Sequence, residues 1–332
     1  MTQADSVHAG AALLEIDCVS KEYRGGVLAN DNISLSVKAG EVFGTLGPNG
    51  AGKTTLVNQI IGLTRPTSGA IRIAGVDVVA RPGFARQACS FQAQTQVPIA
   101  GLTAVQAIEL VGRIRGGSAA DVRQRTRRLI DQFEIGEWSD KMGAQFSGGL
   151  RRLVAFCMAV VVPGRIVILD EPTNDVDPLR RRLLWREVQS LAEAGSSVLL
   201  VTHNVLEAER AVDRLAIVDQ GKVVGTGTPA SLKEHEGEYM RLEVILEPDV
   251  EPPPLPDFLP HTLASNRRLV ARVEEKSLAG AIEWARCLRD SGIAEEFSLG
   301  PATLEDTYVR MVGRLDAIEM PEGGPEDARI AS

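Results

Sequence analysis

Short apolar strands alternate with helices over residues 13 to about 238, and this order predicts an α/β fold. Residues 166–169 and 198–201 are continuously apolar, as expected of strands that are covered on both faces of a sheet. A glycine-rich loop at residues 47–55 lies between an apolar strand and a helix. Together these observations favour a sheet that binds a phosphate-bearing ligand beside the ends of its strands.

The composition fits two domains and a globular chain. Its 332 residues exceed one average domain, and 44% of them are hydrophobic, which is enough for a sizeable core. The formal net charge of -8 argues against a general nucleic-acid binder. We interpret the arginine clusters at residues 123–128 and 180–182 as solvated helix faces, and we expect no nucleic-acid partner.

The sequence argues against a zinc-binding, a disulfide-rich, a secreted and a membrane-spanning protein. The four cysteines form no CxxC pair and the four histidines are dispersed, so we expect no zinc site, no disulfide framework and a reducing compartment. The N-terminal stretch lacks the basic segment of a secretory signal. The longest apolar run, residues 153–162, is about half the length of a bilayer span. We therefore expect neither a signal peptide nor a transmembrane segment.

Periodicity and length predict the elements of the first domain in order. Strands are expected at residues 14–19, 32–37, 42–46, 70–73, 166–169 and 198–201. A helix is expected at residues 53–61, closed by Gly62. Residues 101–160 are richer in helical spacing and show no clear strand. This indicates a helical insertion, at about residues 95–160, within an α/β domain that spans residues 13–238.

The pattern changes after residue 238 and predicts a small α+β domain at residues 239–315. Strands are expected at residues 239–247 and 268–273, and helices at 277–290 and 303–314. Ser277 is a candidate N-cap, and Thr303 and Asp306 stand in capping-box positions. A proline-rich stretch follows the first strand, and residues 316–332 are expected to form a disordered tail.

The loop GPNGAGKTT matches the pattern G-x-x-x-x-G-K-[ST] in the strand–loop–helix context that the motif requires. Backbone N–H groups of such a loop form a concave anion site, to which the helix adds its positive end. Lys53 is predicted to reach the β- and γ-phosphates, and Thr54 to bind Mg²⁺ through its hydroxyl. The predicted nucleotide-binding residues are Gly47, Pro48, Asn49, Gly50, Ala51, Gly52, Lys53, Thr54 and Thr55.

Two acidic residues follow the apolar strand at residues 166–169. The strand carries Asp170 to the carboxyl edge of the sheet, beside the phosphate loop. Hydrolysis of a nucleotide requires a further Mg²⁺ ligand and a group that orients water. We expect Asp170 to hold Mg²⁺, directly or through water, and Glu171 to polarise the attacking water.

A second candidate anion site precedes this strand. Ser147, Gly148 and Gly149 open an apolar helix, and a helix start of this kind binds anions. One nucleotide cannot easily fill both cradles of one domain. The sequence therefore favours a homodimer in which each chain lends its second cradle to the nucleotide of the other.

These motifs, in this order, resemble those of the ATP-binding subunit of an ATP-binding cassette (ABC) transporter over residues 13–235. GPNGAGKTT resembles the Walker A loop, IVILDEP the Walker B strand with its catalytic glutamate, and FSGGLRR the signature motif usually written LSGGQ. The resemblance implies a P-loop NTPase fold with a β-subdomain and a helical insertion. It also implies an ATPase that uses ATP and Mg²⁺.

Further residues acquire roles through this resemblance. Asp177 lies in a stretch similar to the D-loop, which ties the two halves of the dimer together. His203 resembles the switch histidine that contacts the γ-phosphate, and Tyr23 the aromatic residue that stacks on adenine. Counting back from the LT pair at residues 102–103 selects Gln94 as the Q-loop contact to Mg²⁺ and water, with Gln92 as the alternative.

The signature departs from the family pattern at two positions. Phe146 and Leu150 replace the usual Leu and Gln, while Ser147 and both glycines remain. We expect the γ-phosphate contacts to persist and the rim of that site to differ.

The second domain resembles the accessory domain of the daunorubicin-resistance-type subclass, which works with type-two ABC export permeases. The similar stretches are GTPASLKE at residues 227–234 and GPATLEDTYVRMVGR at residues 300–314. The alternative is a domain that only dimerises or braces the first.

The expected function is that of an ATPase subunit that dimerises around two ATP-Mg²⁺ pairs and drives a separate integral membrane permease, in the direction of export. Its expected location is the cytoplasmic face of the membrane, and the helical insertion would offer a groove to a helix of the permease. The alternative is a soluble ABC-type ATPase that acts on a non-transport macromolecular complex. A single cassette, an acidic balance and the lack of paired cysteines disfavour that alternative.

Overall fold

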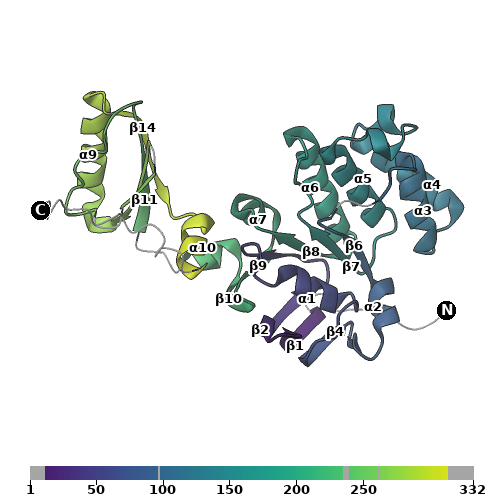
Figure 1. Ribbon diagram of the computed structural model, residues 1–332. Coiled ribbons are helices and arrows are strands. Elements are labelled where there is room, and N and C mark those ends of the chain that lie inside the picture. Colours follow the sequence, from purple (N-terminus) through teal and green to yellow (C-terminus); the bar gives the residue numbers. More distant parts are fainter. Residues whose placement is uncertain (1–11, 96–97, 235–238, 260–261, 266, 313–332) are drawn as a thin grey trace, which may run out of the picture. The chain divides into compact units, whose positions relative to one another are not determined.

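The computed structural model describes residues 12–95, 98–234, 239–259, 262–265 and 267–312 (Figure 1). The chain divides into two compact units, residues 1–235 and 236–332, each of which is described by itself. The predicted tail at residues 316–332 lies outside the described residues. Within the described ranges, no helix combines the length and the apolar character needed to cross a membrane.

A six-stranded sheet forms the centre of the first unit. Four of its strands are parallel neighbours in the order β3-β8-β7-β6, and β9 pairs in parallel with the other side of β3. The outer strand β10 is antiparallel to β9. The bounds are β3 (Val42–Leu46), β6 (Cys89–Gln92), β7 (Ile166–Asp170), β8 (Ser197–Thr202), β9 (Arg214–Asp219) and β10 (Lys222–Gly227).

The three central strands are buried along their whole length, because helices and a second sheet leave neither face to solvent. This explains why their sequences are continuously apolar. A parallel sheet also brings the carboxyl ends of its strands to one edge. The register pairs Leu46 with Thr202 and Asp170 with Val201, so the residues that follow these strands emerge side by side.

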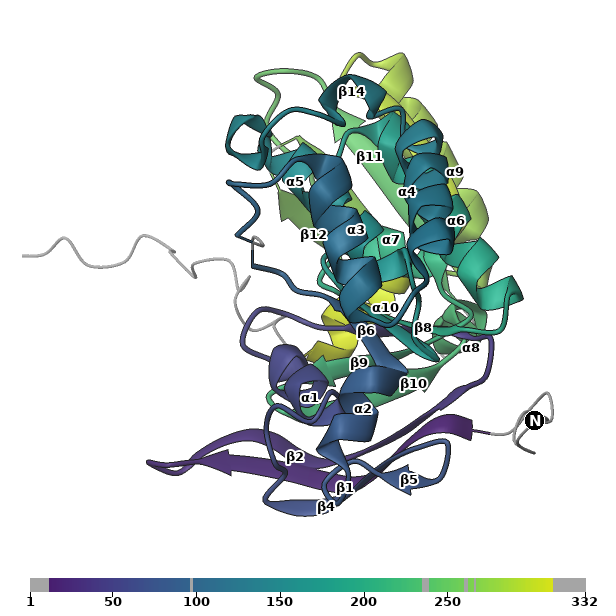
Figure 2. The same cartoon turned by 90° about the vertical axis from the view of Figure 1, so that its right-hand side faces the viewer.

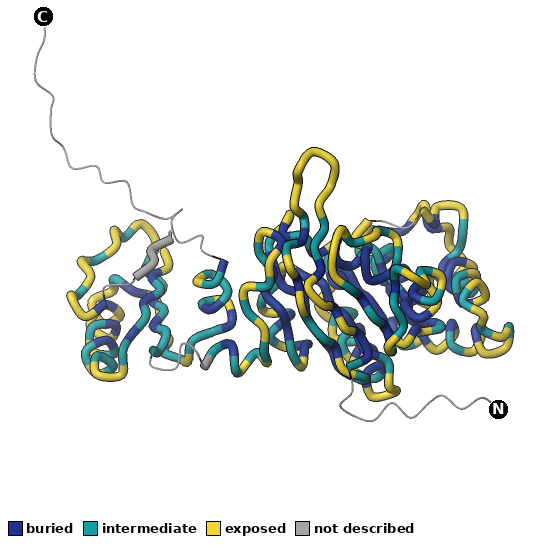
Figure 3. Tube along the Cα trace, turned by 90° about the horizontal axis from the view of Figure 1, so that it is seen from below, coloured by how far each residue is buried: buried dark blue, intermediate teal, exposed yellow. Residues whose placement is uncertain are grey.

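A second, antiparallel sheet has the order β2-β1-β4-β5. Its strands are β1 (Ala12–Tyr23), β2 (Val27–Lys38), β4 (Ser68–Ile73) and β5 (Val76–Asp77). One apolar core joins this sheet to the first, and helix α1 (Lys53–Ile60) contributes Leu56, Val57 and Ile60 to it. The turn of the β1–β2 hairpin projects away from this core, and residues 22–28 are exposed there (Figure 3).

Helices α3 (Ala104–Ile114), α4 (Ala119–Gln132) and α5 (Gly148–Val160) lie together in the first unit (Figure 1; Figure 2). The hydroxyls of Thr103, Ser118 and Ser147 cap their first turns by accepting backbone N–H groups. The apolar residues of α5 are buried, and this helix packs against β6 and β7. The remaining helices of the unit are α2 (Pro82–Ala88), α6 (Pro178–Glu193), α7 (Val205–Ala211) and α8 (Pro229–Glu234).

The predicted strands of the first unit are confirmed, with boundaries that differ by up to five residues. The helix expected at residues 53–61 is confirmed as α1. Strands β5, β6, β9 and β10 were not predicted from the sequence. Strands β6 and β9 pair with β7 and β3, which are distant along the chain, and this pairing is not visible in local periodicity. Strand β10 follows β9 directly and pairs with it across a short turn.

The second unit is a four-stranded antiparallel sheet in the order β12-β13-β11-β14, with helix α9 (Leu278–Asp290) packed on one face. Its strands are β11 (Tyr239–Leu246), β12 (Thr262–Ser265), β13 (Arg268–Glu274) and β14 (Ala294–Pro301). Alternate residues of β11 and β13 join Ala281, Ala285 and Leu288 of α9 in an apolar core. Ser277 stands at the N-cap position of α9, as predicted, but its hydroxyl makes no capping bond. The preceding residues 275–277 form a 3-10 turn, which gives Ser277 a helical backbone.

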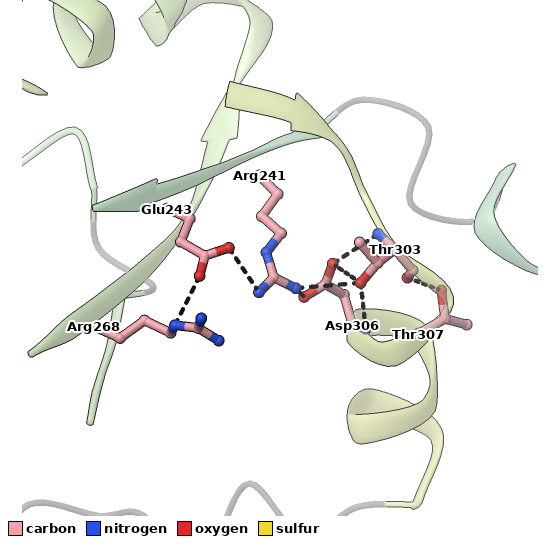
Figure 4. A network of polar contacts seen from close by, with 6 residues as sticks. All are labelled: Arg241, Glu243, Arg268, Thr303, Asp306 and Thr307. Atoms are coloured by element: carbon pink, nitrogen blue, oxygen red, sulfur yellow. Dashed lines mark hydrogen bonds and ion pairs between the residues drawn. The ribbon is translucent and has the colours of Figure 1, made fainter. Parts of the chain in front are cut away.

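Arg241 ties the last helix, α10 (Leu304–Val312), to the sheet of the second unit (Figure 4). Its Nη1 donates to Thr303 Oγ1 over 3.2 Å and to Asp306 Oδ1 over 2.9 Å. Thr303 and Asp306 form the predicted capping box, in which Asp306 N donates to Thr303 Oγ1 and Thr303 N donates to Asp306 Oδ2. Glu243 joins Arg241 to Arg268 and extends this polar network across β11 and β13.

Candidate functional site

The loop between β3 and α1 borders a cavity of about 310 Å³ at the edge where the parallel strands end. Its lining residues are Ala29, Asn49, Gly50, Ala51, Gly52, Lys53, Thr54, Thr55, Gln94, Asp170 and Glu171. Gly52 has a left-handed backbone with φ +98°, and a Cβ there would lie 2.2 Å from the Ala29 carbonyl oxygen. The tight course of this loop therefore requires glycine at position 52.

Lys53 extends across the loop that precedes it. Its Nζ donates to the carbonyl oxygens of Gly47, over 2.6 Å, and Pro48, over 3.0 Å. Burial lowers the pKa of Lys53, while the nearby charges of Glu171 and Asp170 oppose that change. The side chain thus places a buried cation beside the backbone of the phosphate loop.

Asp170, the last residue of β7, is 2% exposed and faces the same cavity. Burial and the neighbouring Glu171 raise the pKa of its carboxyl to about 6, against the opposing charges of Lys53 and Arg152. Its Oδ2 atom is buried and has no hydrogen-bond partner among the described residues. A buried carboxylate oxygen without a partner is costly unless a cation or a donor satisfies it.

Glu171 occupies an unusual backbone conformation with φ +50° directly after β7. Its carboxylate accepts hydrogen bonds from Thr202 Oγ1, over 3.1 Å, and from the backbone N–H of His203, over 2.8 Å. The His203 ring contacts the same carboxylate, with Nδ1 2.6 Å from Oε1. Three contacts from the end of β8 therefore fix one carboxylate at the rim of the cavity.

The two candidate glutamines differ in their surroundings. Gln94 lines the cavity. Gln92 is 1% exposed within β6, and its Nε2 donates to the carbonyl oxygen of Arg152 over 3.1 Å. The geometry supports Gln94 as the cavity contact, because the side chain of Gln92 is engaged inside the protein.

The second cradle, at residues 147–149, is at the start of α5 and is not among the described residues that line this cavity. Ser147 and Gly148 are exposed, and the Ser147 hydroxyl accepts the N–H of Leu150 over 3.3 Å. A Cβ on Gly149 would lie 2.1 Å from the Asp175 carbonyl oxygen, so the D-loop stretch of the same chain packs closely on this glycine.

The two departures in the signature lie on its buried side. Phe146 is 4% exposed and makes an edge contact with the Trp138 ring, while Leu150 is 8% exposed. The expectation that the rim of the site differs stays a prediction, and burial shows only that neither side chain is exposed on it. They pack beneath the loop, where large apolar side chains are stabilised by burial.

Asp177 and Tyr23 also lie outside the cavity lining. Asp177 caps α6 by accepting the N–H groups of Leu179 and Arg180. The N–H of Arg180 is the main cause of a lowered pKa of that carboxyl. Tyr23 ends β1, is 42% exposed and has Lys21 Nζ 5.1 Å from its ring centroid.

Comparison with known proteins identifies the family. The family model described as ABC transporter matches residues 30–174, and a second, described as an AAA domain, matches residues 144–209. The daunorubicin/doxorubicin resistance ATP-binding protein DrrA of Streptomyces peucetius is 32% identical over 96% of this chain and 98% of its own length. The chain belongs to the ATP-binding proteins of ABC transporters. It is accordingly an ATPase with a P-loop NTPase fold.

Other relatives agree with this family. The Nod factor export ATP-binding protein I of Burkholderia lata is 32% identical over 87% of this chain and 94% of its own length. A solved structure described as an ATP binding subunit of an ABC transporter is 30% identical, with a TM-score of 0.64 over 68% of this chain and 93% of that chain. A dimeric post-hydrolysis state of the cassette MJ0796 bound to ADP and Pi is 26% identical, with a TM-score of 0.60 over 65% of this chain and 98% of that chain.

The described residues of this ABC ATPase fit a magnesium ion together with a nucleotide. The partnerless Oδ2 of Asp170, the exposed Thr54 in the first turn of α1 and the amide of Gln94 all face one cavity. These are oxygen donors, which Mg²⁺ prefers, and Mg²⁺ is commonly held by a few protein oxygens together with substrate phosphates.

Sequence reasoning missed three contributors to the site. Ala29 lines the cavity, and Thr202 holds the Glu171 carboxylate. Arg152 opposes the raised pKa of Asp170 and bonds to the segment before Gln94. Thr202 could have been noted from its place beside His203, whereas the other two come from elements distant in the sequence.

Asp170→Asn is expected to stabilise the nucleotide-free protein at neutral pH. The raised pKa means that the folded protein binds more protons than the unfolded chain between pH 4 and about pH 6, so this group lowers the free energy of unfolding as the pH rises through that range. This rise in pKa corresponds to a loss of at most about 3 kcal/mol in the free energy of unfolding at pH 7. Asp170→Asn should regain that free energy at pH 7 but not at pH 4. Urea unfolding in EDTA measures the change.

With ATP and Mg²⁺ bound, wild-type protein should become more stable than Asp170→Asn. Wild-type protein gains stability from the bound ligand, and the variant gains much less because asparagine lacks the negative charge that would bind Mg²⁺. The exposed Asp131 of α4 offers a matched control, and Asp131→Asn should change the free energy of unfolding by less than about 0.5 kcal/mol. Equal stabilisation of wild type and Asp170→Asn by ATP-Mg²⁺ would contradict the assignment of Asp170.

Proposed function

We propose that this chain is the ATP-hydrolysing motor of an exporter, and that it works as a homodimer with a separate membrane permease. The observation that carries the proposal is the Glu171 carboxylate, which Thr202 and His203 hold at the rim of the P-loop cavity. A carboxylate fixed in this way can accept a proton from a water molecule that attacks the γ-phosphate.

The other residues of the cavity have complementary tasks. Lys53 and the backbone N–H groups of the loop bind the phosphate oxygens and balance the charge that develops on them. Thr54, Asp170 and Gln94 would hold Mg²⁺, which supplies neutralisation of the phosphate charge when bound. His203 contacts Glu171 on one side and is 49% exposed in its side chain, so it remains accessible to the γ-phosphate.

Dimerisation completes the site in this proposal. Ser147 and Gly148 are exposed at a helix start, where they can bind the nucleotide of a second chain. The D-loop stretch that ends at Asp177 lies against this cradle through the contact of Asp175 with Gly149. The related cassette MJ0796 is described as a dimer, which supports the same arrangement here.

Pairing with a permease is supported by the relatives, whose names describe drug resistance and Nod factor export. We place the chain at the cytoplasmic face of the membrane. Leu110 and Ile114, 49% and 75% exposed, lie one turn apart on α3 and offer an apolar contact to a helix of the permease. Closure of the dimer on ATP would then move that helix.

Purification from native membranes tests this function. The affinity-tagged chain should retain an integral membrane protein in mild detergent, and the complex should hydrolyse ATP. Leu110→Asp combined with Ile114→Asp should release the membrane protein while ATP binding is kept. Leu255→Asp, at a position 44% exposed in the second unit, serves as the control. Recovery of the ATPase only with a non-membrane macromolecular complex would favour the soluble alternative.

A further inference from the structure

Two hydrogen bonds of opposite direction link helix α5 to the segment that precedes Gln94. Gln92 Nε2 donates to the carbonyl oxygen of Arg152 over 3.1 Å. Arg152 Nη1 donates to the carbonyl oxygen of Ala93, also over 3.1 Å. Ala93 is the residue directly before Gln94, so the guanidinium is bonded to the backbone that carries the cavity glutamine.

Arg152 also stands near the two other functional elements. It lies five residues after Ser147 on the same helix, which is about 7.5 Å along the helix axis. It is one of two cations, with Lys53, whose charge acts on the Asp170 carboxyl. Arg152 therefore belongs to the helix that begins at the second cradle, bonds to the segment before Gln94, and acts through its charge on Asp170.

We propose that Arg152 is a positioning residue for ATP hydrolysis: it holds Gln94 at the cavity and couples the Gln94 segment to the helix that carries Ser147. This inference rests on the proposed function. Arg152 is not among the described residues that line the cavity, so it acts through Gln94 and does not contact the nucleotide. In this proposal Gln94, which orients water in the chain's own site, moves together with the cradle that binds a second chain's phosphate.

The fold of α5 does not depend on this guanidinium. Leu153, Val154 and Phe156 are at most 1% exposed and anchor the helix in the core. The bond from Gln92 is accepted by the Arg152 backbone and persists in any variant at this position. Loss of the guanidinium should therefore loosen the Gln94 segment while leaving the protein folded.

Four variants of the full chain test the proposal: Arg152→Gln, Arg152→Lys, Gln94→Ala and the double variant Gln94→Ala with Arg152→Gln. Arg152→Gln should lower kcat by about 10- to 100-fold, since small misplacement of a positioning group has effects of this size, and should change KM for ATP by less than about threefold. Arg152→Lys keeps a charged donor and should recover part of kcat. The double variant should be no slower than Gln94→Ala within about threefold, because the two residues act as one unit.

Amide hydrogen exchange gives a readout that is independent of turnover. Peptides that cover β6 and Gln94 should exchange faster in Arg152→Gln than in wild type without nucleotide, while peptides from the core of α5 should be unchanged. Arg128→Gln, on the exposed face of α4, removes the same charge elsewhere and should alter neither exchange nor kcat.

Two results would overturn the role of Arg152: multiplicative losses of kcat in the double variant, or a fall in ATP affinity that equals the fall in kcat. The proposed function fails separately. The proposed function would be contradicted if wild-type protein, with or without its permease, bound ATP but did not hydrolyse it. The role of Arg152 is judged from variants measured beside a wild type that turns over ATP.

Discussion

Glu171→Gln is expected to lower kcat by at least about 100-fold while ATP remains bound, because a general base contributes about 10²- to 10⁴-fold to a rate. Glutamine has nearly the same shape as glutamate. Its carbonyl oxygen can still accept the N–H of His203, and its amide nitrogen can donate to the Thr202 hydroxyl, which reverses the direction of that bond. What it loses is the ability to take a proton from water. Phosphate release in ATP and Mg²⁺, measured together with nucleotide binding, separates the two effects.

The matched control for this variant is Glu283→Gln, at an exposed position of α9 in the second unit. It makes the same change of charge away from the cavity and should leave kcat at the wild-type value. Normal turnover by Glu171→Gln would show that another group activates water and would remove Glu171 from the mechanism.

Lys53→Met is expected to weaken ATP binding by about 10- to 100-fold, because a hydrogen bond to a charged group is worth about 1.5–3 kcal/mol. The turnover that remains should fall by about a further 10²-fold, as when a single donor to a developing negative charge is removed. Methionine retains most of the buried stem of lysine and removes the ammonium group. Calorimetric titration with ATP and Mg²⁺ measures the affinity directly.

Lys276→Met provides the comparison for Lys53→Met, since the Lys276 side chain is 80% exposed in the second unit. Its affinity for ATP should equal that of the wild type. If Lys53→Met bound ATP as tightly as this control, the cavity beside the loop would not be the phosphate site.

Much of the site could be predicted from the sequence because its geometry is local. The P-loop is one continuous strand–loop–helix segment, and Asp170 and Glu171 follow one apolar strand. The parallel order of β3, β8 and β7 then brings the ends of these segments to one edge. A similar argument places His203 directly after β8, where its ring meets Glu171.

Other features depend on which direction a side chain faces, and local pattern does not contain that information. Gln92 and Gln94 are separated by one residue, yet one is buried in β6 and the other lines the cavity. Phe146 and Leu150 flank the cradle in the sequence and are buried, while Ser147 between them is exposed. Arg152 could be read as part of the signature helix, but its bond to Ala93 depends on how that helix packs on β6.

The central claim is that two chains bind two ATP molecules between them, with Ser147 of each chain completing the site of the other. The most direct measurement is the mass in solution of Glu171→Gln with ATP and Mg²⁺, alongside the same protein with Ser147→Arg added. We predict a dimer with two bound ATP molecules for Glu171→Gln, and a monomer that still binds ATP when Ser147→Arg is added. The account would be contradicted if Glu171→Gln bound ATP but remained a monomer. It would also be contradicted if the dimer still formed after Ser147→Arg was added.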